Sequence, residues 1–216
     1  MLFAKPPRSG RVKTRLIGEV TADRAAEIYR AFLLDLTGEL AGGSFELRLA
    51  WALDGDEEQP PFEPPLPSTA LVQHGADLGA RLHRALATLV EFGHERVAAV
   101  GSDHPELRAA RVEEAFRALD RYPVVIGPAL DGGYYLIALR ARLLHPRLFE
   151  DIAWSTDSVL EQTIARCTER GLSWRLLEPA ADVDTPADLE ALARRLRRHP
   201  EQCPRTAAVL REWGRL

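Results

Sequence analysis

The chain has 216 residues, enough for one α/β domain with a substantial core, so two domains are not expected. Its formal net charge of −4 shows no basic excess and argues against a nucleic-acid partner. Two cysteines are too few for a disulfide framework and no run of 18 apolar residues occurs, so we expect a cytoplasmic protein that enters no membrane.

Short apolar runs alternate with amphipathic helical patterns, which predicts an α/β fold with a mostly parallel central sheet and helices on both faces. The predicted strands are, in chain order, residues 2–4, 45–53, 70–73, 96–101, 123–127, 134–139 and 174–177. The predicted helices cover residues 21–40, 77–92, 106–121 and 155–170, and a further helix begins at Thr185.

Two segments stand apart from this alternation. Residues 54–69 are acidic and proline-rich, which predicts a surface loop, either a tolerated insertion or a flap over a site. Residues 199–216 are predicted to form a C-terminal helical tail.

The loop after the first strand holds both lysines of the chain, Lys5 and Lys13, whereas the other 26 basic residues are arginine. A compact ammonium suits a phosphate site, although two surface lysines can also fall together by chance. Gly10 permits close backbone approach, and the charges of Lys13 and Arg15 suit a diphosphate or triphosphate. Neither a Walker A loop nor a GxGxxG loop is present, which argues against a P-loop NTPase and a dinucleotide-dependent dehydrogenase.

Carboxylates follow two of the predicted strands. Asp103 comes after residues 96–101, and Asp182 and Asp184 precede the helix that begins at Thr185. Because strand ends meet at one edge of a parallel sheet, a divalent cation, Mg²⁺ or Mn²⁺, is expected to bridge Asp103 and Asp184 to phosphate oxygens. The alternatives are a helix cap for Asp103 and an ion-pair network with the basic loop.

Other candidates have a functional and a structural interpretation. Asp131 with Gly132 and Gly133 either approaches a ligand or forms a tight turn. Asp77 and Gly79 open a helix whose amino end could bind an anion, although Asp77 also suits an N-cap.

Two aromatic side chains are also open to two interpretations. His104 is a weak candidate for a base beside Asp103, and a solvated histidine is the simpler expectation. Trp154 could stack on a sugar or base, but it also suits the core.

Six ordered motifs, KPPRSGRVKTRL, QHGADLGARL, GSDHPEL, GPALDGGYYLIAL, IAWSTDSVLEQT and DVDTPADL, resemble the transferase family associated with radical-SAM and selenodomain genes. That family is similar to the nucleotide-diphospho-sugar transferases, which implies a three-layer, Rossmann-like GT-A fold over residues 1–198. The run from Lys13 to Leu16 is also similar to the first loop of phospholactate guanylyltransferases.

The resemblance implies roles for these residues. Lys5, Gly10, Lys13 and Arg15 would bind the nucleotide phosphates. From their positions in the same loop and at a helix start, we also count Thr14, Asp77 and Gly79 as candidates for nucleotide binding. Asp103 and Asp184 would hold the metal, and Lys13, Asp103 and Asp131 would take part in catalysis. Gly132, Gly133 and Trp154 would line the acceptor side.

The expected activity is glycosyl transfer from a nucleotide sugar to a small-molecule acceptor. The alternative is nucleotidyl transfer, of guanylyl or cytidylyl type, from a nucleoside triphosphate to a small phosphorylated substrate. A third possibility is a nucleotide-binding protein without turnover.

Overall fold

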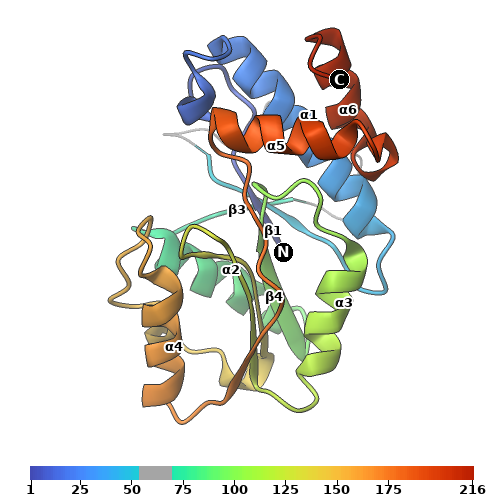
Figure 1. Cartoon of the computed structure of the whole chain (residues 1–216). Helices are drawn as coiled ribbons and strands as arrows, with labels where there is room; N and C mark the ends of the chain where they lie inside the picture. The colour runs from blue at the N-terminus through green and yellow to red at the C-terminus, as the bar shows by residue number, and fades with distance from the viewer. Residues whose placement is uncertain (54–69) are drawn as a thin grey trace.

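The structure is a computed structural model that describes residues 1–53 and 70–216 (Figure 1). The predicted loop over residues 54–69 lies outside the described residues. The described strands are β1 Leu2–Ala4, β2 Leu49–Trp51, β3 Leu71–Val72, β4 Arg96–Gly101, β5 Val124–Pro128, β6 Tyr134–Arg140 and β7 Trp174–Leu176. The described α-helices are α1 Ala22–Ala41, α2 Leu78–Glu91, α3 Ala109–Ala118, α4 Val159–Glu169, α5 Pro186–Leu196 and α6 Pro204–Glu212. Short 3₁₀ helices occupy Thr14–Leu16, Ala141–Leu143, Pro146–Leu148 and Pro200–Gln202.

The strands form one sheet in the order β3-β2-β1-β4-β6-β5-β7. Every pairing is parallel except those of β6, which runs antiparallel between β4 and β5. The carboxyl ends of β1, β2, β3, β4, β5 and β7 therefore lie at one edge of the sheet, here called the carboxyl edge, together with the start of β6. The prediction of a mostly parallel sheet is confirmed.

Two apolar clusters lie on opposite faces of the sheet, because alternate residues of each strand point to opposite sides. On one face the sheet packs against α1, α3, α5 and α6, and on the other against α2 and α4. Figure 1 shows α1, α5 and α6 grouped together at the top of the view, with α2 and α4 below them. The arrangement has three layers, as expected.

Several boundaries differ from the prediction. The second strand begins at Leu49 rather than at residue 45, although Leu47 is buried before it. Helix α3 begins at Ala109 instead of residue 106, because the N–H of Leu107 donates to the carbonyl of His104 in a preceding turn. Helix α4 begins at Val159 instead of residue 155, after Ser155 adopts a left-handed φ of 67°.

The C-terminal segment packs into the body of the protein. Cys203, Ala207 and Leu210 are fully buried in the cluster that contains α1. The predicted division at residue 198 stays a prediction. Within the described ranges, no helix is both long enough and apolar enough to cross a membrane.

Candidate functional site

The loop between β1 and the first 3₁₀ helix has a fixed and unusual backbone. Gly10 has a φ of 72°, and Lys13 has φ 46° and ψ 40°, in the left-handed region that side chains with a Cβ rarely adopt. Val12 and Leu16 anchor the loop in the core, while Arg15 is exposed. This backbone holds Lys13 inward, between two residues of the core.

Lys13 is the centre of the site. Its side chain is only 3% exposed, and its ammonium forms ion pairs with Asp103 and with Asp184, the latter at 2.7 Å between Nζ and Oδ1. The rings of Tyr29 and Phe32 lie 5.8 and 5.7 Å from Nζ. Burial alone would lower the pKa of Lys13, but the two carboxylates raise it above its ordinary value, so the ammonium stays charged.

The two carboxylates come from different parts of the chain. Asp103 follows β4 and Asp184 precedes α5, and the N–H of Val183 donates to the carbonyl of Asp103 at 2.9 Å. Thr185 and Asp188 form a capping box at the start of α5, and the Asp188 side chain also accepts from the N–H of Asp184 at 3.2 Å. Backbone hydrogen bonds therefore fix both carboxylates beside Lys13.

A hydroxyl pair ties the basic loop to the end of β4. The Tyr29 hydroxyl lies 2.7 Å from the hydroxyl of Ser102 and accepts from the backbone N–H of Lys5 at 3.1 Å. Burial raises the pKa of Tyr29, so the phenol stays protonated. Tyr29 of α1 therefore links the loop that begins at Lys5 to the segment that carries Asp103.

A further carboxylate, Asp182, lies close to this cluster. Burial, and after it the charges of Asp103, Asp131 and Asp184, raise the pKa of Asp182 to about 7, although Lys13 acts in the opposite direction. The site therefore contains more acidic groups than the Lys13 ammonium neutralises.

Lys13 and its partners Asp103 and Asp184 line a cavity of about 500 Å³ on the carboxyl edge of the sheet. Six predicted site residues line it: Lys5, Lys13, Thr14, Arg15, Asp103 and Asp184. Polar side chains that we did not predict also line it: Arg11, Tyr29, Gln73, Arg81, Tyr134 and Ser155. The cavity is thus basic on the side of the first loop and acidic at Asp103 and Asp184.

Some of these unpredicted cavity residues could have been identified from their positions in the sequence. Gln73 directly follows β3, and its side-chain amide donates to the carbonyl of Ala50 at 2.8 Å. Arg81 lies in the first turn of α2, beside the predicted Gly79. Tyr134 gave no such signal, because β6 begins at the edge where the parallel strands end.

The donor set of Asp103 and Asp184 fits a divalent cation. Carboxylate oxygens are ligands that Mg²⁺ and Mn²⁺ prefer, and the side chains are 47% and 35% exposed. Both bind Lys13 through Oδ1, so each has a second oxygen for another ligand. No group of three or more His, Cys, Asp or Glu positioned for a metal occurs in the part of the chain that the structure describes, so other ligands would have to complete the shell.

The glycine pair near Asp131 forms a tight turn. The Asp131 side chain accepts from the N–H of Gly133 at 2.9 Å, and Gly132 has a φ of 91°. A Cβ on Gly132 would lie 2.1 Å from the carbonyl oxygen of Asp157, so only glycine fits there. Asp131, Gly132 and Gly133 are not among the described residues that line the cavity.

The remaining candidates for nucleotide binding, Asp77 and Gly79, have structural roles at the start of α2. Asp77 is the N-cap of α2, where its side chain accepts from the N–H of Ala80 at 2.7 Å. Gly79 is buried, and a Cβ on it would lie 2.2 Å from the carbonyl oxygen of Phe149. Neither lines the cavity within the described ranges, whereas their neighbours Leu78 and Arg81 do.

The aromatic candidates Trp154 and His104 are both half-buried and pack against other parts of the protein. Trp154 lies edge-on to Tyr134, with ring centroids 6.4 Å apart, and joins the apolar cluster of α2 and α4. His104 points away from the site: Nδ1 lies 2.9 Å from the carbonyl oxygen of Ala181, and the side chain lines a different cavity of about 470 Å³. Burial lowers the pKa of His104, which favours the neutral ring.

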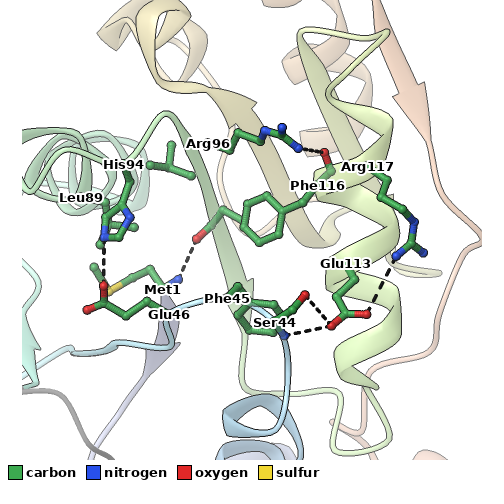
Figure 2. A pocket seen from close by; sticks show the side chains of 12 residues that line it. Met1, Ser44, Phe45, Glu46, Leu89, His94, Arg96, Glu113, Phe116 and Arg117 are labelled. Atoms are coloured by element: carbon green, nitrogen blue, oxygen red, sulfur yellow. Dashed lines mark hydrogen bonds and ion pairs between the residues drawn. The ribbon is translucent and has the colours of Figure 1, made fainter.

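Another pocket, of about 350 Å³, lies at the opposite edge of the sheet, beside the starts of β1 and β4 (Figure 2). Its rim carries partnered polar side chains: Nε2 of His94 lies 3.2 Å from Oε2 of Glu46, and Glu113 accepts from Ser44 at 2.9 Å and forms an ion pair with Arg117 at 3.9 Å. Phe45 and Phe116 form part of its apolar wall. None of the predicted site residues lines this pocket.

A family model described as an uncharacterized protein conserved in bacteria, DUF2064, matches residues 39–156. The structure is similar to that of a protein from Desulfovibrio desulfuricans G20 described as a "putative nucleotide-diphospho-sugar transferase", with 35% identity and a TM-score of 0.90. The similarity covers 98% of this chain and 92% of that chain. A comparison with curated proteins gave no match.

More distant structures share the fold alone. A cytidylyltransferase from Leptospira borgpetersenii serovar Hardjo-bovis has 11% identity and a TM-score of 0.53, over 94% of each chain. CMP:2-keto-3-deoxy-manno-octonic acid synthetase, in complex with CTP, has 15% identity and a TM-score of 0.51, over 92% of this chain and 97% of that chain. The α/β fold is therefore one that nucleotide-using transferases also have.

Proposed function

This chain belongs to the bacterial protein family DUF2064, and from that premise we propose that it transfers a sugar from a nucleotide sugar to a small-molecule acceptor. The observation that carries the proposal is the buried Lys13 between Asp103 and Asp184, at a cavity of about 500 Å³ on the carboxyl edge of the sheet. In open α/β sheets, ligands bind at this edge. The size of the cavity lies in the range of small-molecule sites.

The basic side of the cavity is suited to the diphosphate of the nucleotide. The cations that line it are Lys5, Arg11, Arg15 and Arg81, and Thr14, next to Arg15, lines it too. Arginine can donate two parallel hydrogen bonds to a phosphate, which gives orientation as well as attraction. These residues would hold the diphosphate while its bond to the sugar breaks.

Asp103 and Asp184 would hold a divalent cation, Mg²⁺ or Mn²⁺. Such an ion supplies positive charge that neutralises the diphosphate as it leaves. The role of the protein is to keep the two carboxylates side by side, through Lys13 and through the backbone hydrogen bond between Val183 and Asp103. The metal ligation is part of the proposal, as are the phosphate contacts.

In the transfer, the bond between the sugar carbon and the diphosphate oxygen breaks, and its electron pair stays on the diphosphate. A hydroxyl oxygen of the acceptor forms the new bond to that carbon, and its proton goes to a carboxylate. Asp131 is our candidate for this base, because it lies in the turn that follows β5 at the carboxyl edge of the sheet. We assign the acceptor side to the turn of Gly132 and Gly133 and to Trp154, whose ring lies against that of Tyr134.

A second candidate function is nucleotidyl transfer. The observation that favours it is the number of cations at the cavity, because Lys5, Arg11, Arg15 and Arg81 are sufficient for a triphosphate. A phosphate of the acceptor would then attack the α-phosphorus, and pyrophosphate would leave toward the basic loop. A guanylyl or cytidylyl transferase would use the same cavity.

The deciding experiment is calorimetric titration with UDP, GDP, CTP and GTP, with and without Mn²⁺, followed by turnover assays. Sugar transfer requires metal-dependent binding of a nucleoside diphosphate, and release of that diphosphate from its nucleotide sugar. Release of pyrophosphate from a triphosphate would establish the second candidate instead. A protein that binds nucleotide but turns over neither class of substrate would contradict both enzymatic functions.

A matched pair of variants localises the binding. Arg15→Met removes a cation from the cavity wall, whereas Arg142→Met removes an exposed cation from the distant 3₁₀ helix after β6. We expect the first to weaken nucleotide binding about tenfold and the second to leave it unchanged. Equal affinities would show that the nucleotide binds outside this cavity.

A further inference from the structure

Lys13 occupies the space between the two carboxylates that the proposed function assigns to a metal. We propose that Lys13 is a built-in cation that weakens the binding of free divalent ions to Asp103 and Asp184, so that metal and nucleotide bind tightly only together. The inference rests on the proposed function, because it concerns the same nucleotide site. It gives Lys13 a role different from direct phosphate binding.

The first argument is that the ammonium has little freedom to leave. The Lys13 side chain is 3% exposed, with Tyr29 and Phe32 beside Nζ. Its backbone is held in the left-handed region between the buried Val12 and the 3₁₀ helix. An incoming metal ion therefore encounters a fixed positive charge in contact with both of its ligands.

The second argument is electrostatic. Asp103 and Asp184 supply two negative charges, and Lys13 cancels one of them at contact distance. A divalent ion at the same pair is repelled by the ammonium, and the repulsion is strong where the ammonium is shielded from water. Asp131 and Asp182 lie nearby and are not substituted in any variant considered below, and loss of the Lys13 charge favours the neutral form of Asp182, which does not strengthen metal binding.

Phosphate groups reverse this balance. A nucleoside diphosphate brings negative charge to the cavity, and the basic wall of Lys5, Arg11, Arg15 and Arg81 holds it there. The metal ion then has phosphate oxygens in addition to the two carboxylates. Since such coupling is reciprocal, the nucleotide must strengthen metal binding by the same factor by which the metal strengthens nucleotide binding.

The chain offers a matched control, because it contains only two lysines and both lie in this loop. Lys13→Met and Lys5→Met each remove one positive charge with little change in side-chain length. Only Lys13 contacts the carboxylate pair, whereas Lys5 is exposed at the cavity wall. Free Mn²⁺ is measured by electron paramagnetic resonance while each protein is titrated without nucleotide.

We expect Lys13→Met to bind Mn²⁺ at least tenfold more tightly than the wild type, and Lys5→Met to stay within about threefold of it. The gain from adding UDP or GDP should be smaller in Lys13→Met than in the wild type. Equal or weaker Mn²⁺ binding by Lys13→Met would overturn the inference, and so would a wild type that binds Mn²⁺ equally well with and without nucleotide.

A measurement on the wild type covers the case in which Lys13→Met does not fold. Lysine labelled with ¹³C at Cε gives two signals, which Lys5→Met assigns. Mg²⁺ alone should leave the Lys13 signal in place, and Mg²⁺ with nucleoside diphosphate should shift it. A shift with Mg²⁺ alone, or with the nucleotide in the presence of EDTA, would overturn the inference.

Failure of the proposed function gives a different result. A protein that binds none of the four nucleotides, with or without Mn²⁺, contradicts the nucleotide site itself. The comparison of Mn²⁺ affinities between Lys13→Met and Lys5→Met still decides whether Lys13 opposes the metal.

Discussion

Two sites with carboxylates, one in the core and one at the cavity, differ in the partners of those carboxylates. Asp35 on α1 is 6% exposed and accepts three hydrogen bonds, from the N–H groups of Arg205 and Thr206 and from the Thr206 hydroxyl, at 2.7 to 2.9 Å. Asp103 and Asp184, in contrast, are one-third to one-half exposed and share the ammonium of Lys13.

The difference separates a carboxylate that stabilises the fold from a pair that can bind a ligand. Asp35 holds the start of α6 against α1, where a negative charge also suits the amino end of a helix. Asp103 and Asp184 each use one oxygen on Lys13 and turn toward a cavity. Substitution should therefore affect stability at the first site and binding at the second.

The largest effect is expected for Asp35→Ala, with a loss of about 4 kcal/mol in the free energy of unfolding. The change leaves two N–H groups at the start of α6 and the hydroxyl of the buried Thr206 without their acceptor. Urea unfolding measures the loss, and Asp35→Asn, which keeps one acceptor oxygen, should lose about half as much. Nucleotide affinity of the folded fraction should not change, and a parallel loss of affinity would contradict the separation.

Asp103→Asn should weaken ligand binding and leave the stability of the fold nearly unchanged. We expect metal-dependent nucleotide binding to weaken at least 100-fold, about 2.7 kcal/mol. The midpoint of thermal unfolding should stay within a few degrees, because Asp184 still pairs with the Lys13 ammonium and the new asparagine keeps an acceptor oxygen. Calorimetry with and without Mn²⁺ measures the loss. Metal-free nucleotide binding serves as the control, because the basic wall of the cavity is intact. An unchanged metal-dependent affinity would remove Asp103 from the proposed metal site.

Much of the fold could be predicted from the sequence, because apolar periodicity reports which residues meet the sheet. The strand over residues 96–101 was predicted with its observed bounds, since β4 is buried on both faces. The direction of β6 could not be read in the same way. A strand that enters the sheet backwards has the same pattern of side chains as a parallel one, so Tyr134 was not expected at the carboxyl edge.

The site was predictable where a residue directly follows a parallel strand. Lys5 and Asp103 follow β1 and β4, and the structure brings both to one cavity. Asp77 and Gly79 show the limit of this reasoning. They were predicted to bind an anion at the amino end of α2, but Asp77 caps the helix and Gly79 packs against Phe149. The structure shows ion pairs between the basic loop and both carboxylates, which was one of the alternatives drawn from the sequence. That Lys13 is the cation that makes both was not predictable, because it depends on the left-handed backbone at Lys13.

Lys13→Arg should destabilise the protein by about 2 kcal/mol although the charge is kept. The planar guanidinium is larger than the ammonium, and the space beside Tyr29 and Phe32 leaves little room for it. Lys5→Arg is the control, and we expect a change below about 0.5 kcal/mol because the side chain is exposed. Equal stability of the two variants, measured by urea unfolding, would show that the Lys13 pocket is adaptable.

The smallest effect concerns two helix caps. Thr185→Ala removes the cap of α5 and should cost about 1 kcal/mol, and Thr21→Ala removes the cap of α1 at a similar or smaller cost. Only the first cap lies next to Asp184, whose N–H also donates to Asp188 in the same box. Thr185→Ala should therefore weaken metal-dependent nucleotide binding about threefold in calorimetry, whereas Thr21→Ala should not. If both caps changed stability alone, the position of Asp184 would be fixed by Lys13 rather than by the start of α5.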